Sequence, residues 1–180
     1  MEAIYGLWSE ENFGWSANDL GFAFLAIGAG GLFAQLVLIG PLAGRYGEAR
    51  VIVMGLVLLD ASMLLQPLIR MPVSGVALMG LLMVGHSLAF PSAGALLSRN
   101  IPPDRQGGTM GLLMASNAVG RIVAPPLFGL IYAQVGYDAP WYVGAAAIGL
   151  VTLLALQAVR LSAPRPAPSS GAAANAAPPR

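Results

Sequence analysis

Three residues that can carry charge interrupt long apolar stretches of this sequence: Asp60, His86 and Arg121. A charged group among apolar residues is costly, so such a residue is usually functional or paired with a partner. The carboxyl group of Asp60 could take up and release a proton. The alternative is that Asp60 is a structural partner for an arginine, or forms a hydrogen bond between helices.

His86 and Arg121 offer two further kinds of chemistry. An imidazole titrates near neutral pH, so His86 could exchange a proton or contact a substrate, whereas a lone histidine is more often a hydrogen-bonded packing residue. Arg121 lies one helical turn after Asn117 and could pair with Asp60 or hold an anionic group of a substrate. The alternative for Arg121 is a purely structural pair, or a side chain that extends to the membrane surface.

The composition of the whole chain explains why these charges stand out. Of the 180 residues, 57% are hydrophobic and only 9% are charged, whereas about 25% of the residues of an average soluble domain are charged. This deficit excludes an ordinary soluble enzyme or DNA-binding module and indicates a multi-span membrane protein.

Catalysis, metal binding and nucleic-acid binding are not expected. The chain has no cysteine and one histidine, which is too few ligands for a zinc site. It also lacks a nucleophile elbow and a phosphate-binding loop. We therefore expect no catalytic residue, no cofactor, no metal and no nucleic-acid partner.

The elements that position the charged residues are expected to be five membrane-spanning helices of an all-α protein. Each apolar stretch has about 19 residues or more, enough for a helix to cross the roughly 30 Å hydrocarbon core of a bilayer. Their Leu, Ala and Gly content favours helices over the shorter, alternating strands of a barrel. The predicted spans are residues 20–40, 51–69, 73–98, 108–135 and 141–159, within a transmembrane region of residues 20–160.

The positions of the arginines predict the orientation of these helices. Seven of the nine lie in alternate loops or in the C-terminal segment, on one side of the predicted bundle. By the positive-inside rule this side is cytoplasmic, so we expect a cytoplasmic C-terminus and a bacterial inner membrane. The seven are Arg45, Arg50, Arg99, Arg105, Arg160, Arg165 and Arg180.

The two ends of the chain are expected to differ from the spans. Residues 1–19 carry four acids and no basic residue, and we interpret them as the outer end of a truncated helix followed by an extracytoplasmic loop. Residues 161–180 are rich in Pro, Ala and Ser, which predicts a disordered cytoplasmic tail. The five spans therefore look like six helices from which most of one is missing.

Two loop segments carry a family resemblance. Residues 40–50 (GPLAGRYGEAR) have the spacing Gly-x-Leu-Ala-x-Arg-x-Gly-x-x-Arg, and residues 97–107 (LSRNIPPDRQG) resemble a matching loop. On these motifs the chain resembles the C-terminal half of a major facilitator superfamily transporter, in particular the drug/proton antiporters of the tetracycline efflux branch. Gly44 replaces the usual acidic residue of the first motif. The motif positions to which the resemblance assigns a conformational role are Gly40, Arg45, Gly47 and Arg50.

The resemblance implies a twelve-helix fold whose two halves enclose a cavity, with substrate and coupling protons near the membrane midplane. This chain would supply helices eight to twelve. In the family the helix of His86 lines the cavity, and Gln35 matches a glutamine of the tetracycline branch, while Gly31 replaces a histidine frequent there. The substrate-cavity candidates are Gln35, His86, Asn117 and Arg121, and the proton-coupling candidates are Asp60 and His86.

A proline-containing segment of the fourth span adds further conformational candidates. The pattern Gly120-x-x-x-Ala124-Pro125-Pro126-x-x-Gly129 resembles, by internal pseudo-symmetry, the antiporter motif of the family's fifth helix. A proline removes a backbone hydrogen bond and bends a helix. We expect Gly120, Pro125 and Pro126 to act in conformational change, and the alternative is a kinked, tightly packed helix with no further role.

The sequence therefore predicts half of a membrane transporter, with the lipid bilayer, protons and a small molecule as its partners. Proton-coupled efflux of a small amphiphilic compound or drug is the favoured hypothesis, because the predicted cavity walls are apolar with few polar groups. One alternative is a metabolite uptake transporter of the same fold. Another is a truncated, transport-incompetent fragment, or a subunit of a split transporter whose N-terminal half is a separate chain.

Overall fold

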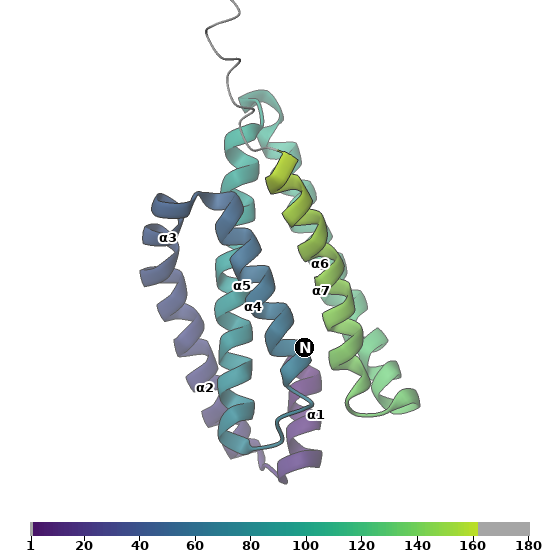
Figure 1. Ribbon diagram of the computed structural model, residues 1–180. Coiled ribbons are helices and arrows are strands. Elements are labelled where there is room, and N and C mark those ends of the chain that lie inside the picture. Colours follow the sequence, from purple (N-terminus) through teal and green to yellow (C-terminus); the bar gives the residue numbers. More distant parts are fainter. Residues whose placement is uncertain (1, 162–180) are drawn as a thin grey trace, which may run out of the picture.

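The structure is a bundle of long helices (Figure 1). It is a computed structural model that describes residues 2–161, and all regular secondary structure in that range is helical, as the sequence predicted. The tail predicted at residues 161–180 lies outside the described residues, except for Leu161, which ends the last helix. The elements are α1 (Glu2–Phe13), α2 (Ala17–Phe33), η1 (Ala34–Leu38), α3 (Ile39–Tyr46), α4 (Glu48–Leu65), α5 (Pro72–Asn100), α6 (Pro103–Val135) and α7 (Ala139–Leu161).

Four helical runs of the described chain are long and apolar enough to cross a membrane: Ala17–Tyr46, Pro72–Asn100, Asp104–Val135 and Ala139–Arg160. The first run joins α2 and α3 through the π-helical turn η1. The fifth long helix, α4, has 18 residues and contains three charged ones, Glu48, Arg50 and Asp60. It ends at Leu65, four residues before the end of the predicted span, because Pro67 has no N–H to continue the helical hydrogen bonds.

The start of the first run is set by local hydrogen bonds. The Ser16 backbone N–H donates to the Asp19 carboxylate at 2.9 Å, and the Asp19 N–H donates to the Ser16 hydroxyl at 3.4 Å. This reciprocal pair is a capping box, which satisfies amide groups that have no partner within the helix. The polar residues of the N-terminal segment therefore define where the first long helix begins.

The helices α4 and α5 approach each other closely at two glycines, Gly55 and Gly85. A Cβ atom placed on Gly55 would lie 2.6 Å from the Gly85 carbonyl oxygen, and one placed on Gly85 would lie 2.6 Å from the Gly55 carbonyl oxygen. Small residues are the usual means by which membrane helices approach closely. The helix α4 also packs against α7, and α2 packs against α5.

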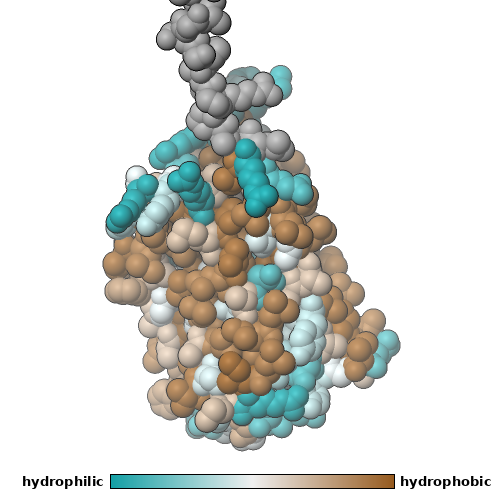
Figure 2. Space-filling model, viewed as in Figure 1, coloured by the Kyte–Doolittle hydropathy of each residue, from teal (hydrophilic) through white to brown (hydrophobic). Residues whose placement is uncertain are grey.

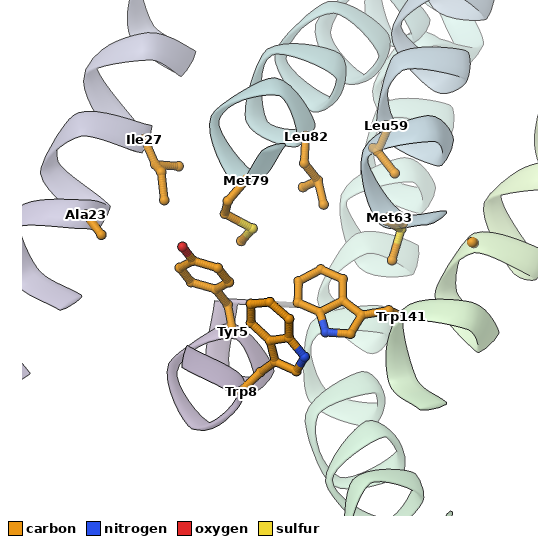
Figure 3. Close-up of a cluster of buried hydrophobic side chains, with 10 residues drawn as sticks. Tyr5, Trp8, Ala23, Ile27, Leu59, Met63, Met79, Leu82 and Trp141 are labelled. Atoms are coloured by element: carbon orange, nitrogen blue, oxygen red, sulfur yellow. The ribbon is translucent and has the colours of Figure 1, made fainter. Parts of the chain in front are cut away.

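The helix α1 and the α4–α5 and α6–α7 connections lie at one end of the bundle, the α1 end (Figure 1). The α3–α4 and α5–α6 connections lie at the other end, the α3 end (Figure 1). Near the α1 end, the rings of Tyr5, Trp8 and Trp141 are completely buried and lie close to one another (Figure 3). Trp141 meets Trp8 and Tyr5 edge-to-face, with centroid separations of 5.9 and 6.4 Å. Through these aromatic contacts α1 packs against the start of α7.

The surface between the two ends is mostly hydrophobic. Figure 2 shows a broad apolar face with hydrophilic side chains gathered toward the top and bottom of the view. Phe22, Leu36 and Ile122 are each more than 70% exposed. Such a surface would aggregate in water and suits contact with lipid tails or with another apolar protein surface.

Candidate functional site

A cavity of about 620 Å³ lies between α4, α5, α6 and α7, with Ile4 of α1 in its wall. This volume is within the range of roughly 300–1,000 Å³ that is usual for sites of drug-sized ligands. Most of the lining is apolar or glycine: Ile4, Leu59, Met63, Leu82, Met83, Gly120, Ala124, Pro125, Phe128, Gly144, Ala147 and Ile148. The cavity is open on one side, and its walls can therefore contact an apolar molecular body without surrounding it.

Three polar side chains complete the lining: His86 on α5, and Asn117 and Arg121 on α6. Asn117 and Arg121 are four residues apart, which places them on the same face of their helix. The structure thus brings together three of the four residues predicted to line a substrate cavity. Their roles stay predictions, while their common location is a result of the tertiary structure.

Arg121 does not pair with Asp60, which was one of the roles considered for it. Among residues 2–161 the ion pairs are Arg70–Asp138, Arg99–Glu48 and Arg105–Asp104, and none includes Arg121. Asp60 is not part of the cavity lining either. Asp60 faces Gly149 of α7, whereas Arg121 is an exposed residue of α6 that lines the cavity.

Asp60 lies where α4 packs against α7. Its Oδ2 atom is 3.5 Å from the position that a Cβ atom on Gly149 would occupy, so the missing side chain of Gly149 makes room for the carboxylate. The Oδ1 atom is buried and has no hydrogen-bond partner among the described residues. A buried oxygen of this kind is uncommon and calls for an explanation, such as a proton or a further partner.

Gln35, the fourth cavity candidate, is not in the lining. It lies in η1 and its side chain is exposed. A π-helical turn within a longer α-helix is often found at functional sites, and the sequence alone did not predict it. His86 is exposed as well, but it lines the cavity, and its ring stacks on that of Phe90 with a centroid separation of 5.7 Å.

The residues predicted to act in conformational change fall into two places. Gly40, Arg45, Gly47 and Arg50 lie in or near the α3–α4 connection at the α3 end, where Gly47 has a φ of 81° that favours glycine. Gly120 and Pro125 line the cavity, and the adjacent Pro126 does not. Neighbouring Glu48 forms an ion pair of 3.2 Å with Arg99, which links the two loop motifs and was not predicted.

A polar network at the α1 end was not predicted from the sequence. The indole Nε1 of Trp8 donates to Asp138 Oδ1 at 3.0 Å, and the Arg70 guanidinium donates to Asp138 Oδ2 at 2.7 Å. The same guanidinium donates to the Tyr137 hydroxyl at 3.2 Å. The network joins α1 to both connections at this end. Its only signal in the sequence was that Arg70 is the one arginine predicted on the extracytoplasmic side of the bundle.

Comparison with known proteins places these features in context. Residues 3–180 match the Major Facilitator Superfamily. The class D tetracycline resistance protein of Salmonella ordonez is 29% identical over 158 residues, which cover 85% of this chain and 39% of that protein. The class C tetracycline resistance protein of Escherichia coli is 30% identical over 158 residues, which cover 86% of this chain and 39% of that protein.

The chain is also similar to a protein that is not named as a tetracycline resistance protein, the probable anion transporter 3, chloroplastic, of Arabidopsis thaliana. It is 29% identical over 143 residues, which cover 78% of this chain and 28% of that protein. The chain thus spans about two fifths of the length of the tetracycline resistance proteins that it matches. No solved structure gives a significant match.

Proposed function

Because the chain belongs to the Major Facilitator Superfamily, a family of transporters rather than enzymes, we propose that it forms the C-terminal half of a proton-coupled exporter of a small amphiphilic compound or drug. The observation that carries this proposal is the cavity of about 620 Å³ with apolar walls and three polar groups. The names of the tetracycline resistance proteins among its relatives support an efflux role.

The remaining half of the transporter would cover α6. None of the described side chains of α6 is buried, and its apolar residues Leu112 and Ile122 are 67% and 73% exposed. Alternating access requires two halves that move around a central site. An N-terminal half packed against α6 would close the open side of the cavity and complete its wall.

Orientation in the bacterial inner membrane is proposed from the charges at the two ends. Arg45, Arg50 and Arg99 lie near the α3 end, which would be cytoplasmic by the positive-inside rule. The acids Glu10 and Glu11 lie on α1, at the opposite end. The C-terminus would then be cytoplasmic and the α1 end extracytoplasmic.

Asp60 is the proposed coupling acid. Its buried Oδ1 has no hydrogen-bond partner among the described residues, and the carboxylate is held at the α4–α7 interface rather than in the cavity. Proton binding at Asp60 would remove a buried charge between two helices. It would thereby change how tightly α4 and α7 pack while the substrate occupies the neighbouring cavity.

The test is drug accumulation in cells that produce this chain with and without the N-terminal half of the class C tetracycline resistance protein. We expect accumulation of tetracycline or ethidium to fall only when both halves are present. Dissipation of the proton gradient should restore accumulation. If both halves insert into the membrane and associate but accumulation does not change, the efflux proposal is rejected, and the chain is a transport-incompetent fragment or carries another substrate.

A second candidate function is uptake of an anionic metabolite by the same fold. Arg121 in the cavity lining favours it, as does the name of the Arabidopsis thaliana relative, a probable anion transporter. Export and uptake differ in the direction of transport relative to the proton gradient. Transport in proteoliposomes with an imposed proton gradient distinguishes export from uptake. In export, substrate and protons move across the membrane in opposite directions.

A further inference from the structure

The cavity has an unbalanced positive charge. Its lining contains the guanidinium of Arg121, the imidazole of His86 and the carboxamide of Asn117, and no carboxylate. The acids of the surrounding elements lie outside this lining. Asp60 of α4 faces Gly149 of α7. Asp138 pairs with Arg70, Glu48 pairs with Arg99, and Glu11 accepts a hydrogen bond from the Tyr132 hydroxyl at 2.8 Å.

The charge of Arg121 lies far from both ends of its helix. Arg121 is separated by about 27 Å of helix from Pro103, where α6 begins, and by about 21 Å from Val135, where it ends. Arg121 therefore does not reach the water at either end of α6, and in the described chain it is exposed at the open side of the cavity. A charge at this depth costs several kcal/mol unless a partner or water compensates for it.

The donors in the cavity match the chemistry of an oxyanion. A guanidinium offers a planar fork of N–H groups that fits a carboxylate or sulfonate in a bidentate manner. The Asn117 amide one turn away and the His86 ring on the facing helix α5 can each donate a further hydrogen bond. The apolar walls, which include Met63, Leu82 and Phe128, face the rest of the cavity, which is open on one side.

We infer that the cavity between α5 and α6 selects amphiphilic organic anions, whose acidic group binds Arg121 with help from Asn117 and His86. The apolar body of such a ligand packs against the apolar walls, to which α4, α5, α6 and α7 all contribute. This inference rests on the proposed transport function, and it specifies the substrate class that the same site takes. Neutral and cationic compounds with the same apolar body bind more weakly, because they leave the guanidinium without a counter-charge.

A set of three probes with the same bicyclic body tests the inference. They are 2-naphthoate, 2-naphthalenemethanol and 2-naphthylmethylammonium, which are anionic, neutral and cationic. Their dissociation constants are measured with the chain reconstituted in neutral phosphatidylcholine vesicles, and binding to vesicles without protein is subtracted. We expect 2-naphthoate to bind at least about tenfold more tightly than the alcohol, and the ammonium compound to bind least tightly.

Variants assign the preference to Arg121. The Arg121→Gln variant should bind the anion and the alcohol equally within about twofold, whereas Arg121→Lys should keep a preference of several-fold because it keeps the charge. The matched control is Arg105→Gln, whose side chain is 81% exposed and outside the cavity, and which should behave like the unaltered chain. Circular dichroism and gel filtration check that each variant is folded.

Several results would overturn the inference. One is an equal or stronger affinity for the ammonium probe, and another is a preference for the anion that survives in Arg121→Gln. If Arg121→Gln does not fold, the Arg121→Lys variant decides. The inference is overturned if that variant folds but binds all three probes with equal affinity. Loss of the preference when an N-terminal half is added would mean that a carboxylate of that half, and not a ligand, pairs with Arg121.

The inference and the proposed export function can fail separately. Arg121-dependent binding of 2-naphthoate without proton-driven transport of any drug would retain the inference and reject proton-coupled efflux. Proton-driven export of ethidium, a cation, that is unaffected by Arg121→Gln would retain efflux and reject the inference.

Discussion

The guanidinium of Arg70 lies 2.7 Å from the carboxylate of Asp138, although 68 positions separate the two residues in the sequence. Arg70 belongs to the α4–α5 connection and Asp138 to the α6–α7 connection, so the pair ties the two helical hairpins together at the α1 end. Asp138 also accepts the hydrogen bond from Trp8, which adds α1 to the same network. The Asp138 carboxylate therefore connects α1, the α4–α5 connection and the α6–α7 connection.

Replacement of Asp138 should weaken this end of the bundle more than replacement of Arg70. In Asp138→Ala the buried Trp8 indole loses its acceptor, which costs about 1–3 kcal/mol. Arg70→Gln leaves that hydrogen bond in place and removes an ion pair whose arginine is about half exposed, so its effect should be smaller. The measurement is the thermal midpoint in detergent. Equal midpoints for Asp138→Ala and the unaltered chain would mean that the network does not stabilise the bundle.

Gly85 should not tolerate even a single methyl group. In Gly85→Ala the new Cβ would lie 2.6 Å from the Gly55 carbonyl oxygen and 2.8 Å from the Leu59 amide nitrogen, so α4 and α5 would have to separate. Overpacking of this kind costs about 1–3 kcal/mol. The control is Gly80→Ala on the same helix, where nothing lies within 4 Å of the new Cβ. The thermal midpoint should fall for Gly85→Ala and stay level or rise for Gly80→Ala.

Asp60→Asn should abolish proton-driven efflux by the complete transporter and leave membrane insertion intact. The amide keeps the size of the side chain beside Gly149 but cannot bind and release a proton. Drug uptake into inverted vesicles with an imposed pH gradient measures the effect. The same change at an exposed acid, Asp104→Asn, is the control. Undiminished proton-driven uptake by Asp60→Asn would reject Asp60 as the coupling acid.

The two amide side chains among the cavity candidates should respond differently to truncation. Asn117→Ala should weaken 2-naphthoate binding by the chain about three- to tenfold, because it removes a donor from the cavity lining. Gln35→Ala, a matched change at an exposed position outside the lining, should leave the affinity unchanged. The readout is the dissociation constant in vesicles. A loss at Gln35 as large as that at Asn117 would place the binding site at the α2–α3 face instead.

Long-range partners could not be read from the sequence. Asp60 and Arg121 were considered as a pair because both are charged and lie inside apolar stretches, yet Asp60 packs against Gly149 of α7 and Arg121 lines the cavity. In a soluble helix an apolar stripe identifies the buried face. The helices of this chain are apolar nearly all round, so their periodicity does not reveal which neighbour each face meets. Gln35 was therefore grouped with Asn117 and Arg121, although it lies outside the cavity.

The sequence by itself determined the properties that depend on local composition and length. These are the all-α membrane class, the long apolar helices, the family membership and the identity of the charged residues within the spans, because hydropathy and loop motifs are continuous along the chain. Only the tertiary structure decided which residues meet. The Gly55–Gly85 crossing, the Trp8–Asp138–Arg70 network and the separation of Asp60 from Arg121 depend on how each helix is rotated against its neighbours. That rotation is set by side-chain packing between segments far apart in the sequence.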